Sequence, residues 1–151
     1  MRAVVLISVL ALAAPVRPPR DPVPNEARPL AEQIQGEWQV IDAKVSGRPH
    51  RSVKPGEVVV WVFASNKKIL RLPSNKEYTY EFTLDTTRQP AFIDSVLTKD
   101  GTMDRKGQPS MGIVKIEGDV LTICLNSAAR PTEFISSADT KAALWQMKRV
   151  K

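Results

Sequence analysis

The chain has 151 residues and a mass of 16.8 kDa, which leaves room for one domain and not two. With 42% hydrophobic and 25% charged residues it is not disordered throughout, and twelve Pro with a single Cys exclude a disulfide scaffold and disfavour a helical bundle. The net charge of +6 comes from basic residues spread along the chain, without the clustered charge and interleaved aromatics of a nucleic-acid-binding face, so no nucleic-acid partner is expected.

The first residues carry the pattern of a secretory signal. Arg2 supplies a positive charge, and an unbroken apolar run from Ala3 to Ala14 follows it and contains the small residues that a signal peptidase reads. The run is too short to span about 30 Å of hydrocarbon comfortably as a helix. We expect residues 1–14 to be a signal peptide that directs export to the periplasm, the cell envelope or the medium. An uncleaved N-terminal anchor is the alternative.

A proline-rich stretch separates this segment from the folded domain. Residues 15–29 contain six Pro, a density that prevents helix and sheet alike and gives an extended, semi-rigid linker. We therefore expect the folded domain to occupy residues 30–151.

The domain begins with one short helical turn over residues 30–35, in which Leu30 and Ile34 form the buried pair and Gly36 ends the turn. The rest shows the two-residue period of β-strands. In the first strand the apolar residues change phase after Val40, which predicts a β-bulge there. Gly118-Asp119 separates two strand-like runs and predicts a two-residue type II′ hairpin. Strands are expected at residues 38–45, 57–63, 67–72, 78–84, 92–98, 110–117, 120–125 and 142–150.

This pattern predicts an all-β fold. Eight antiparallel strands of this length, joined mostly by short turns, can close into a barrel whose interior is filled or holds one small ligand. A two-sheet sandwich is the competing architecture, and periodicity alone does not separate the two.

The start and end of the strand pattern resemble lipocalins. Gly36-Glu37-Trp38 matches the Gly-x-Trp signature of that family, in which the Trp plugs one end of the barrel beneath a basic residue of the last strand. Arg149 is the matching basic residue here. The resemblance implies an eight-stranded lipocalin-like barrel closed by the structural pair Trp38 and Arg149.

A closer resemblance covers nearly all of residues 33–150. The order of motifs is similar to that of a family of uncharacterised, mostly exported lipocalin-like domains that is abundant in planctomycete bacteria, although Val114 stands where that family usually carries an aromatic. The family implies a fold and no established activity. The matching segments are Gln35-Gly36-Glu37-Trp38, Gly47-Arg48-Pro49, residues 80–85 followed by Pro90, Ile93-Asp94, Gly112-Ile113, residues 117–124, Arg130-Pro131-Thr132-Glu133-Phe134 and Lys148-Arg149.

Residues that could carry chemistry are few. His50 lies in a loop without a carboxylate-rich neighbour, so a solvated loop histidine is expected rather than a catalytic base. Cys124 lies in a strand and is expected to be a small core residue. In the Arg130 to Phe134 run, Arg130 is expected to pair with Glu133 while Phe134 enters the core. Trp61 either fills the barrel end or lines a cavity. We expect no catalytic residues, no metal site and no cofactor.

A binding role remains. One hypothesis is that the barrel binds a small lipophilic molecule; the other is a non-enzymatic interaction or assembly module with a filled barrel and a protein partner in the envelope. Enzymatic activity is the least favoured class. A cavity of about 300 Å³ or more would favour the ligand, since typical pockets start near that size. The residues expected to line the barrel are Tyr78, Tyr80, Phe82, Ile93, Leu121, Ile123, Trp145 and Met147.

Overall fold

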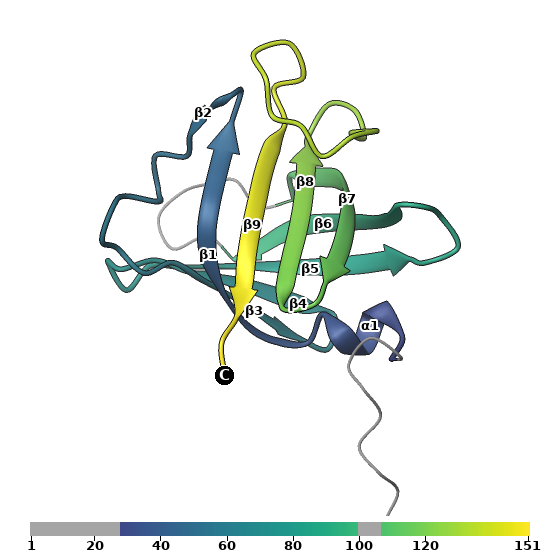
Figure 1. Cartoon of the computed structure of the whole chain (residues 1–151), viewed down its shortest axis with the longest axis horizontal. Coiled ribbons are helices and arrows are strands. Elements are labelled where there is room, and N and C mark those ends of the chain that lie inside the picture. The colour runs from purple at the N-terminus through teal and green to yellow at the C-terminus, as the bar shows by residue number, and fades with distance from the viewer. Residues whose placement is uncertain (1–27, 100–106) are drawn as a thin grey trace, which may run out of the picture.

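The structure is a computed structural model that describes residues 28–99 and 107–151 (Figure 1). Within these two ranges there is one short helix, α1 (Leu30–Gln33), and a single antiparallel sheet. No helix in the described ranges is long and apolar enough to span a membrane. The strands are β1 (Gly36–Val45), β2 (Arg48–Pro49), β3 (Val60–Ala64), β4 (Lys67–Arg71), β5 (Glu77–Asp85), β6 (Ala91–Lys99), β7 (Pro109–Glu117), β8 (Val120–Asn126) and β9 (Ala143–Arg149).

The sheet closes on itself. Strands β3 to β9 pair in sequence order, and β1 pairs with β3 on one side and with β9 on the other. The two-residue strand β2 extends only the end of β1, so the other eight strands form the barrel. The predicted eight-stranded antiparallel, lipocalin-like barrel with a short N-terminal helical turn is therefore confirmed. The sandwich alternative is wrong, because the β1–β9 pairing leaves one closed sheet.

Local signals in the sequence locate two of the irregularities. The β1–β9 register shifts between Val40 and Asp42, where the phase of apolar residues predicts a bulge, and Ile41 faces solvent there. At the β7–β8 hairpin Gly118 has a φ of +58°, the left-handed conformation that the first central position of a type II′ turn requires.

Several predicted boundaries are wrong by one to three residues; β1, for example, begins at Gly36 rather than at Trp38. Strand β3 begins at Val60 rather than at Glu57, because a turn precedes it: Gly56 has a φ of +81°, and the Glu57 amide donates to the Lys54 carbonyl oxygen over 3.1 Å. Helix α1 ends at Gln33, two residues before the expected end. Ile34 is nonetheless fully buried, as the helical pattern predicts.

A second, smaller apolar cluster lies on the outer face of β7 and β8, beneath the segment that joins β8 to β9. The predicted core residue Cys124 is fully buried there and packs with Ile113 and Ala142, with Phe134 partly buried against them. Burial raises the pKa of the Cys124 thiol, which donates to the Ile135 carbonyl oxygen over 3.6 Å. The thiol therefore behaves as a small core residue.

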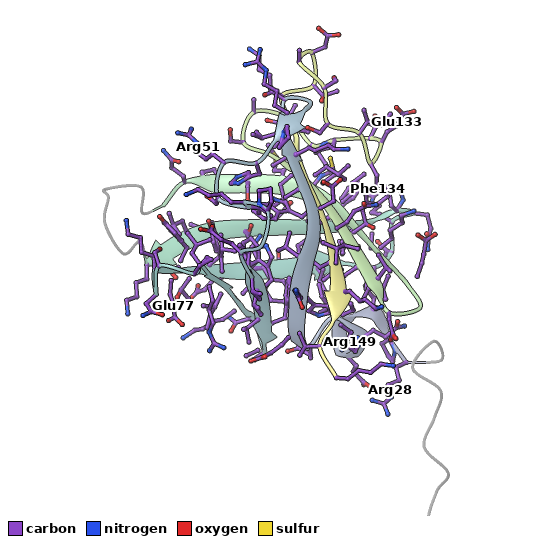
Figure 2. All side chains as sticks on the ribbon, turned by 60° about the vertical axis from the view of Figure 1, so that its left-hand side comes forward. Arg28, Arg51, Glu77, Glu133, Phe134 and Arg149 are labelled. Atoms are coloured by element: carbon purple, nitrogen blue, oxygen red, sulfur yellow. The ribbon has the colours of Figure 1, made fainter. Side chains whose placement is uncertain are left out.

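One end of the barrel is closed beside α1. Trp38 is fully buried there, and its Nε1 donates to the Ile34 carbonyl oxygen over 2.8 Å. The Arg149 guanidinium carbon lies 4.1 Å from the centroid of the Trp38 ring, and the same group donates to the carbonyl oxygens of Gln33 and Gln35. Figure 2 shows Arg149 at this end and Arg51 toward the opposite end. These side chains fill the end of the barrel beside α1. A binding site inside the barrel can therefore open only at the opposite end.

Candidate functional site

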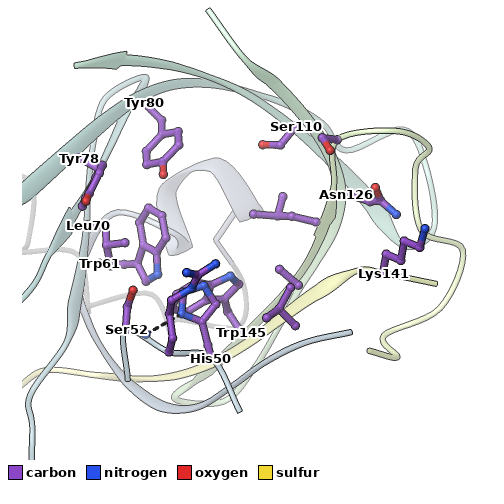
Figure 3. A pocket seen from close by; sticks show the side chains of 15 residues that line it. His50, Ser52, Trp61, Leu70, Tyr78, Tyr80, Ser110, Asn126, Lys141 and Trp145 are labelled. Atoms are coloured by element: carbon purple, nitrogen blue, oxygen red, sulfur yellow. Dashed lines mark hydrogen bonds between the residues drawn. The ribbon is translucent and has the colours of Figure 1, made fainter. Parts of the chain in front are cut away.

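A pocket of about 560 Å³ opens at the end of the barrel opposite the Trp38–Arg149 pair (Figure 3). Its walls come from the strand ends at that side and from the two segments that follow β2 and β8. The lining residues are Val45, His50, Arg51, Ser52, Trp61, Leu70, Tyr78, Tyr80, Ser110, Leu125, Asn126, Ser127, Lys141, Ala143 and Trp145.

Aromatic rings form the deep part of this pocket. The Trp61 and Trp145 rings meet edge to face, with centroids 5.6 Å apart and planes at 89°. The Tyr80 ring also contacts the Trp61 ring, with the two ring centroids 5.6 Å apart. Such contacts are the geometry that the quadrupoles of aromatic rings favour. The rings therefore present a rigid apolar surface to anything that enters.

Strand register explains why these rings meet. On β3, Trp61 is opposite Leu70 of β4, and Leu70 is opposite Tyr78 of β5. Side chains at directly opposed positions face the same side of a sheet. One row across three strands thus supplies a continuous apolar wall, and the two-residue period places Tyr80 on the same face as Tyr78.

The rim of the pocket is polar and basic. His50, Arg51 and Lys141 line it, and none of the described residues that line it is a carboxylate. His50 packs 4.7 Å from the Trp145 ring, and its Nδ1 accepts a hydrogen bond from the Ser52 amide over 3.2 Å. The expectation of a solvated loop histidine is therefore wrong, because the segment after β2 folds over the pocket. Burial, with a smaller contribution from the nearby Arg51 charge, lowers the pKa of His50.

Lys68 is the residue that the sequence analysis missed. It points into the barrel from β4 and is 1% exposed, and its Nζ lies 5.1 Å from the Trp61 centroid and 4.9 Å from the Tyr80 centroid. Burial lowers the pKa of Lys68 to about 7. No carboxylate of the described residues lies within 4.0 Å of its Nζ. Within the described part of the chain, the recorded contacts of the ammonium are therefore the faces of two rings.

A second polar group is unsatisfied at the same place. Trp61 is 4% exposed, and its buried Nε1 has no hydrogen-bond acceptor among the described residues. A buried donor without an acceptor costs about 1 to 3 kcal/mol. Trp61 Nε1 and Lys68 Nζ therefore lie on neighbouring strands: the indole N–H lacks the acceptor that burial ordinarily demands, and the ammonium faces two rings without a carboxylate of the described residues within 4.0 Å.

The residues predicted to line the barrel divide between two levels. Tyr78, Tyr80 and Trp145 line the pocket. The others pack in the main apolar cluster between the pocket and the closed end, and these are Phe82, Ile93, Leu121, Ile123 and Met147. Trp61 both packs in that cluster and lines the pocket, so the two roles proposed for it coexist.

The Arg130 to Phe134 run takes a different arrangement from the predicted one. Arg130 pairs with Asp94 of β6, with 2.6 Å between Nη1 and Oδ1, and not with Glu133. Its guanidinium lies 4.1 Å from the Phe92 centroid and also donates to the Gly112 carbonyl oxygen over 2.8 Å. Phe134 packs outside the barrel. The run fastens the β8–β9 segment to the outer face of the sheet, where a long-range ion pair outcompetes the local one.

Within the described ranges, no three His, Cys, Asp or Glu side chains gather into a group that could hold a metal ion. Comparisons with models of protein families, with curated proteins and with solved structures found no match. The pocket and its chemistry are therefore the basis for a functional proposal.

Proposed function

We propose that the domain binds a small lipophilic molecule in the pocket at the open end of the barrel, and that it does so without catalysing a reaction. The observation that carries the proposal is the pocket itself, about 560 Å³ in volume and floored by Trp61, Tyr80 and Trp145. Sites for small molecules have volumes of roughly 300 to 1,000 Å³ and are lined mainly by apolar and aromatic side chains. A barrel filled to both ends would offer no such site.

The proposal also includes a location. The charged start, the apolar run from Ala3 to Ala14 and the proline-rich linker support export of the domain, tethered or free, as does the resemblance to exported lipocalin-like domains. An exported binding domain would meet its ligand outside the cytoplasm. A lipophilic molecule in that compartment needs a protein carrier or receptor because it is poorly soluble in water.

Binding can be measured with N-phenyl-1-naphthylamine, an uncharged dye whose fluorescence rises in apolar surroundings. We expect the full chain to bind it with saturation at one site. Replacing Ala143, which lines the pocket, by Phe fills part of the volume and should abolish the signal. The matched control is Gln39→Phe, which places the same ring on the exposed outer face of β1.

Two outcomes would favour the alternative, an interaction or assembly module without a ligand. One is the absence of saturable dye binding. The other is equal binding by Ala143→Phe and Gln39→Phe, which would place the dye outside the barrel. Native mass spectrometry after mild extraction supplies an independent test, because a carrier should retain a small molecule that Ala143→Phe lacks.

A further inference from the structure

The interior of the barrel contains a lysine, Lys68, that forms no ion pair with the described residues. Lys68 is 1% exposed and its only close partners in the described part of the chain are the rings of Trp61 and Tyr80. A buried ammonium costs several kcal/mol unless an opposite charge or good acceptors compensate it. A methionine would fill the same space without that cost. The lysine is therefore explained better by a binding role than by packing.

The neighbouring groups add donors and positive charge. Trp61 Nε1 is buried without an acceptor, and Trp61 lines the pocket. The rim adds the positive charges of Arg51 and Lys141 and the imidazole of His50, with no carboxylate among the described residues that line it. Among the described residues, the charged side chains that line the pocket are basic, and Lys68 lies against two of the lining rings, so these groups favour an anion.

We propose that the ligand is a lipophilic organic monoanion whose carboxylate accepts hydrogen bonds from Lys68 Nζ and from Trp61 Nε1. Its apolar body lies against Trp145 and Tyr80 in the deep part of the pocket. This inference rests on the proposed function and names the class of molecule for that same pocket.

The number of donors selects a carboxylate over a phosphate. Lys68 and Trp61 offer one positive charge and one neutral N–H at the buried position, which match the single charge and two oxygens of a carboxylate. A phosphate dianion would leave a buried negative charge uncompensated there. The flexible four-carbon stem of Lys68 lets its ammonium reach a headgroup between the two rings.

A matched pair of dyes isolates the headgroup. 1-Anilinonaphthalene-8-sulfonate and N-phenyl-1-naphthylamine share one ring system, and only the first carries a single negative charge. Both are titrated into the full chain and into Lys68→Met, which removes the charge and keeps the volume. Lys67→Met is the control, because Lys67 precedes Lys68 on β4 but is exposed on the outer face.

We expect Lys68→Met to weaken binding of the sulfonate dye by about tenfold or more, as for loss of a hydrogen bond to a charged group. Binding of the neutral dye should be unchanged or tighter, and Lys67→Met should change neither. Trp61→Phe should weaken sulfonate binding by a few-fold, about what one neutral donor contributes. In the wild-type chain, decanoate should displace the dye at lower concentration than 1-decanol. The comparison of decanoate with 1-decanol uses only the wild-type chain, so it does not depend on whether a variant folds.

The outcomes separate the two proposals. If both dyes bind, but Lys68→Met and Lys67→Met behave alike and decanoate competes no better than decanol, the anionic headgroup is refuted and the apolar pocket stands. If neither dye binds at a saturable site, both proposals fail. If sulfonate binding depends on Lys68 but decanol matches decanoate, a carboxylate is not the headgroup, and the proposal fails in that form.

Discussion

The two ends of the barrel each contain a cation beside an indole ring, and they differ in how the polar atoms are paired. At the closed end Arg149 lies over Trp38 and donates from both terminal nitrogens to backbone carbonyl oxygens, and the Trp38 N–H has its own acceptor, so that of these groups only Arg149 Nε is buried without an acceptor among the described residues. At the open end Lys68 lies over Trp61 with no carboxylate of the described residues within 4.0 Å of its Nζ, and the Trp61 N–H has no acceptor among those residues. The first arrangement stabilises the fold, whereas the second places an indole that lines the pocket beside a buried ammonium.

The largest expected effect is at the closed end. Replacing Trp38 by Ala should lower the free energy of unfolding by about 3 to 5 kcal/mol, as for other buried aromatic side chains. Chemical denaturation of the full chain measures this loss. A free energy of unfolding within about 1 kcal/mol of the wild-type value would show that the Trp does not close the barrel.

At the open end we expect a substitution to increase the free energy of unfolding rather than to lower it. Lys68→Met should raise the free energy of unfolding on the order of 3 kcal/mol at pH 6, because it removes a buried charge whose pKa in the folded protein is about 7 against an ordinary value of 10.5. Below pH 7 the lysine is charged in both the folded and the unfolded chain, so the full burial cost is present.

This gain should shrink with rising pH. Between pH 7 and 10.5 only the unfolded chain holds the proton, so the wild-type protein gains stability and the advantage of Met narrows. The other titratable or charged groups that line the pocket are His50, Arg51, Tyr78, Tyr80 and Lys141. They are present in both proteins, so the difference between the two denaturation curves reports the Lys68 charge together with its coupling to these neighbours. A difference independent of pH would mean that Lys68 is not a buried titrating group.

A smaller loss is expected for Arg149→Met. The change removes the cation from the Trp38 ring and leaves the carbonyl oxygens of Gln33 and Gln35 without this donor, at a cost of about 2 kcal/mol. Thermal denaturation followed by Trp fluorescence measures the effect. A variant as stable as the wild type would remove the basis for treating the closed end as a structural pair.

The smallest effect is expected for Trp61→Phe, which is compared with the matched replacement Trp38→Phe at the closed end. Trp61→Phe loses some ring area and also removes an unpaired donor, so its stability should stay within about 1 kcal/mol of the wild type. Trp38→Phe loses ring area together with the hydrogen bond to Ile34, and it should cost about 2 kcal/mol. Equal losses for the two variants would contradict the difference in polar pairing between the ends.

Much of the fold follows from local patterns, and the site follows from them only in part. Two-residue periodicity locates the strands, and the phase change after Val40 locates the bulge, because side-chain direction in a strand depends only on position. The same parity places Lys68 with Leu70 on the inner face of β4. A short strand that begins with two lysines looks solvated until the barrel closes around it.

The predictions for His50 and Arg130 are wrong for a related reason. Their partners, the Trp145 ring and the Asp94 carboxylate, lie far away in the sequence, and a lone chain offers no signal for such pairings. Local reasoning pairs Arg130 with Glu133 because those residues are neighbours. Barrel closure provides a nearer carboxylate on β6 and an aromatic face beside it.

The most direct test of the open-end site is the titration of Lys68 Nζ by NMR, in protein labelled with ¹³C and ¹⁵N at lysine, with and without decanoate. The expected pKa is about 7 without decanoate. With saturating decanoate it should rise by about one unit or more, since a bound carboxylate favours the charged ammonium. A Lys68 resonance that titrates near 10.5, or a pKa that decanoate leaves unchanged, would contradict an anion-binding lysine inside the barrel.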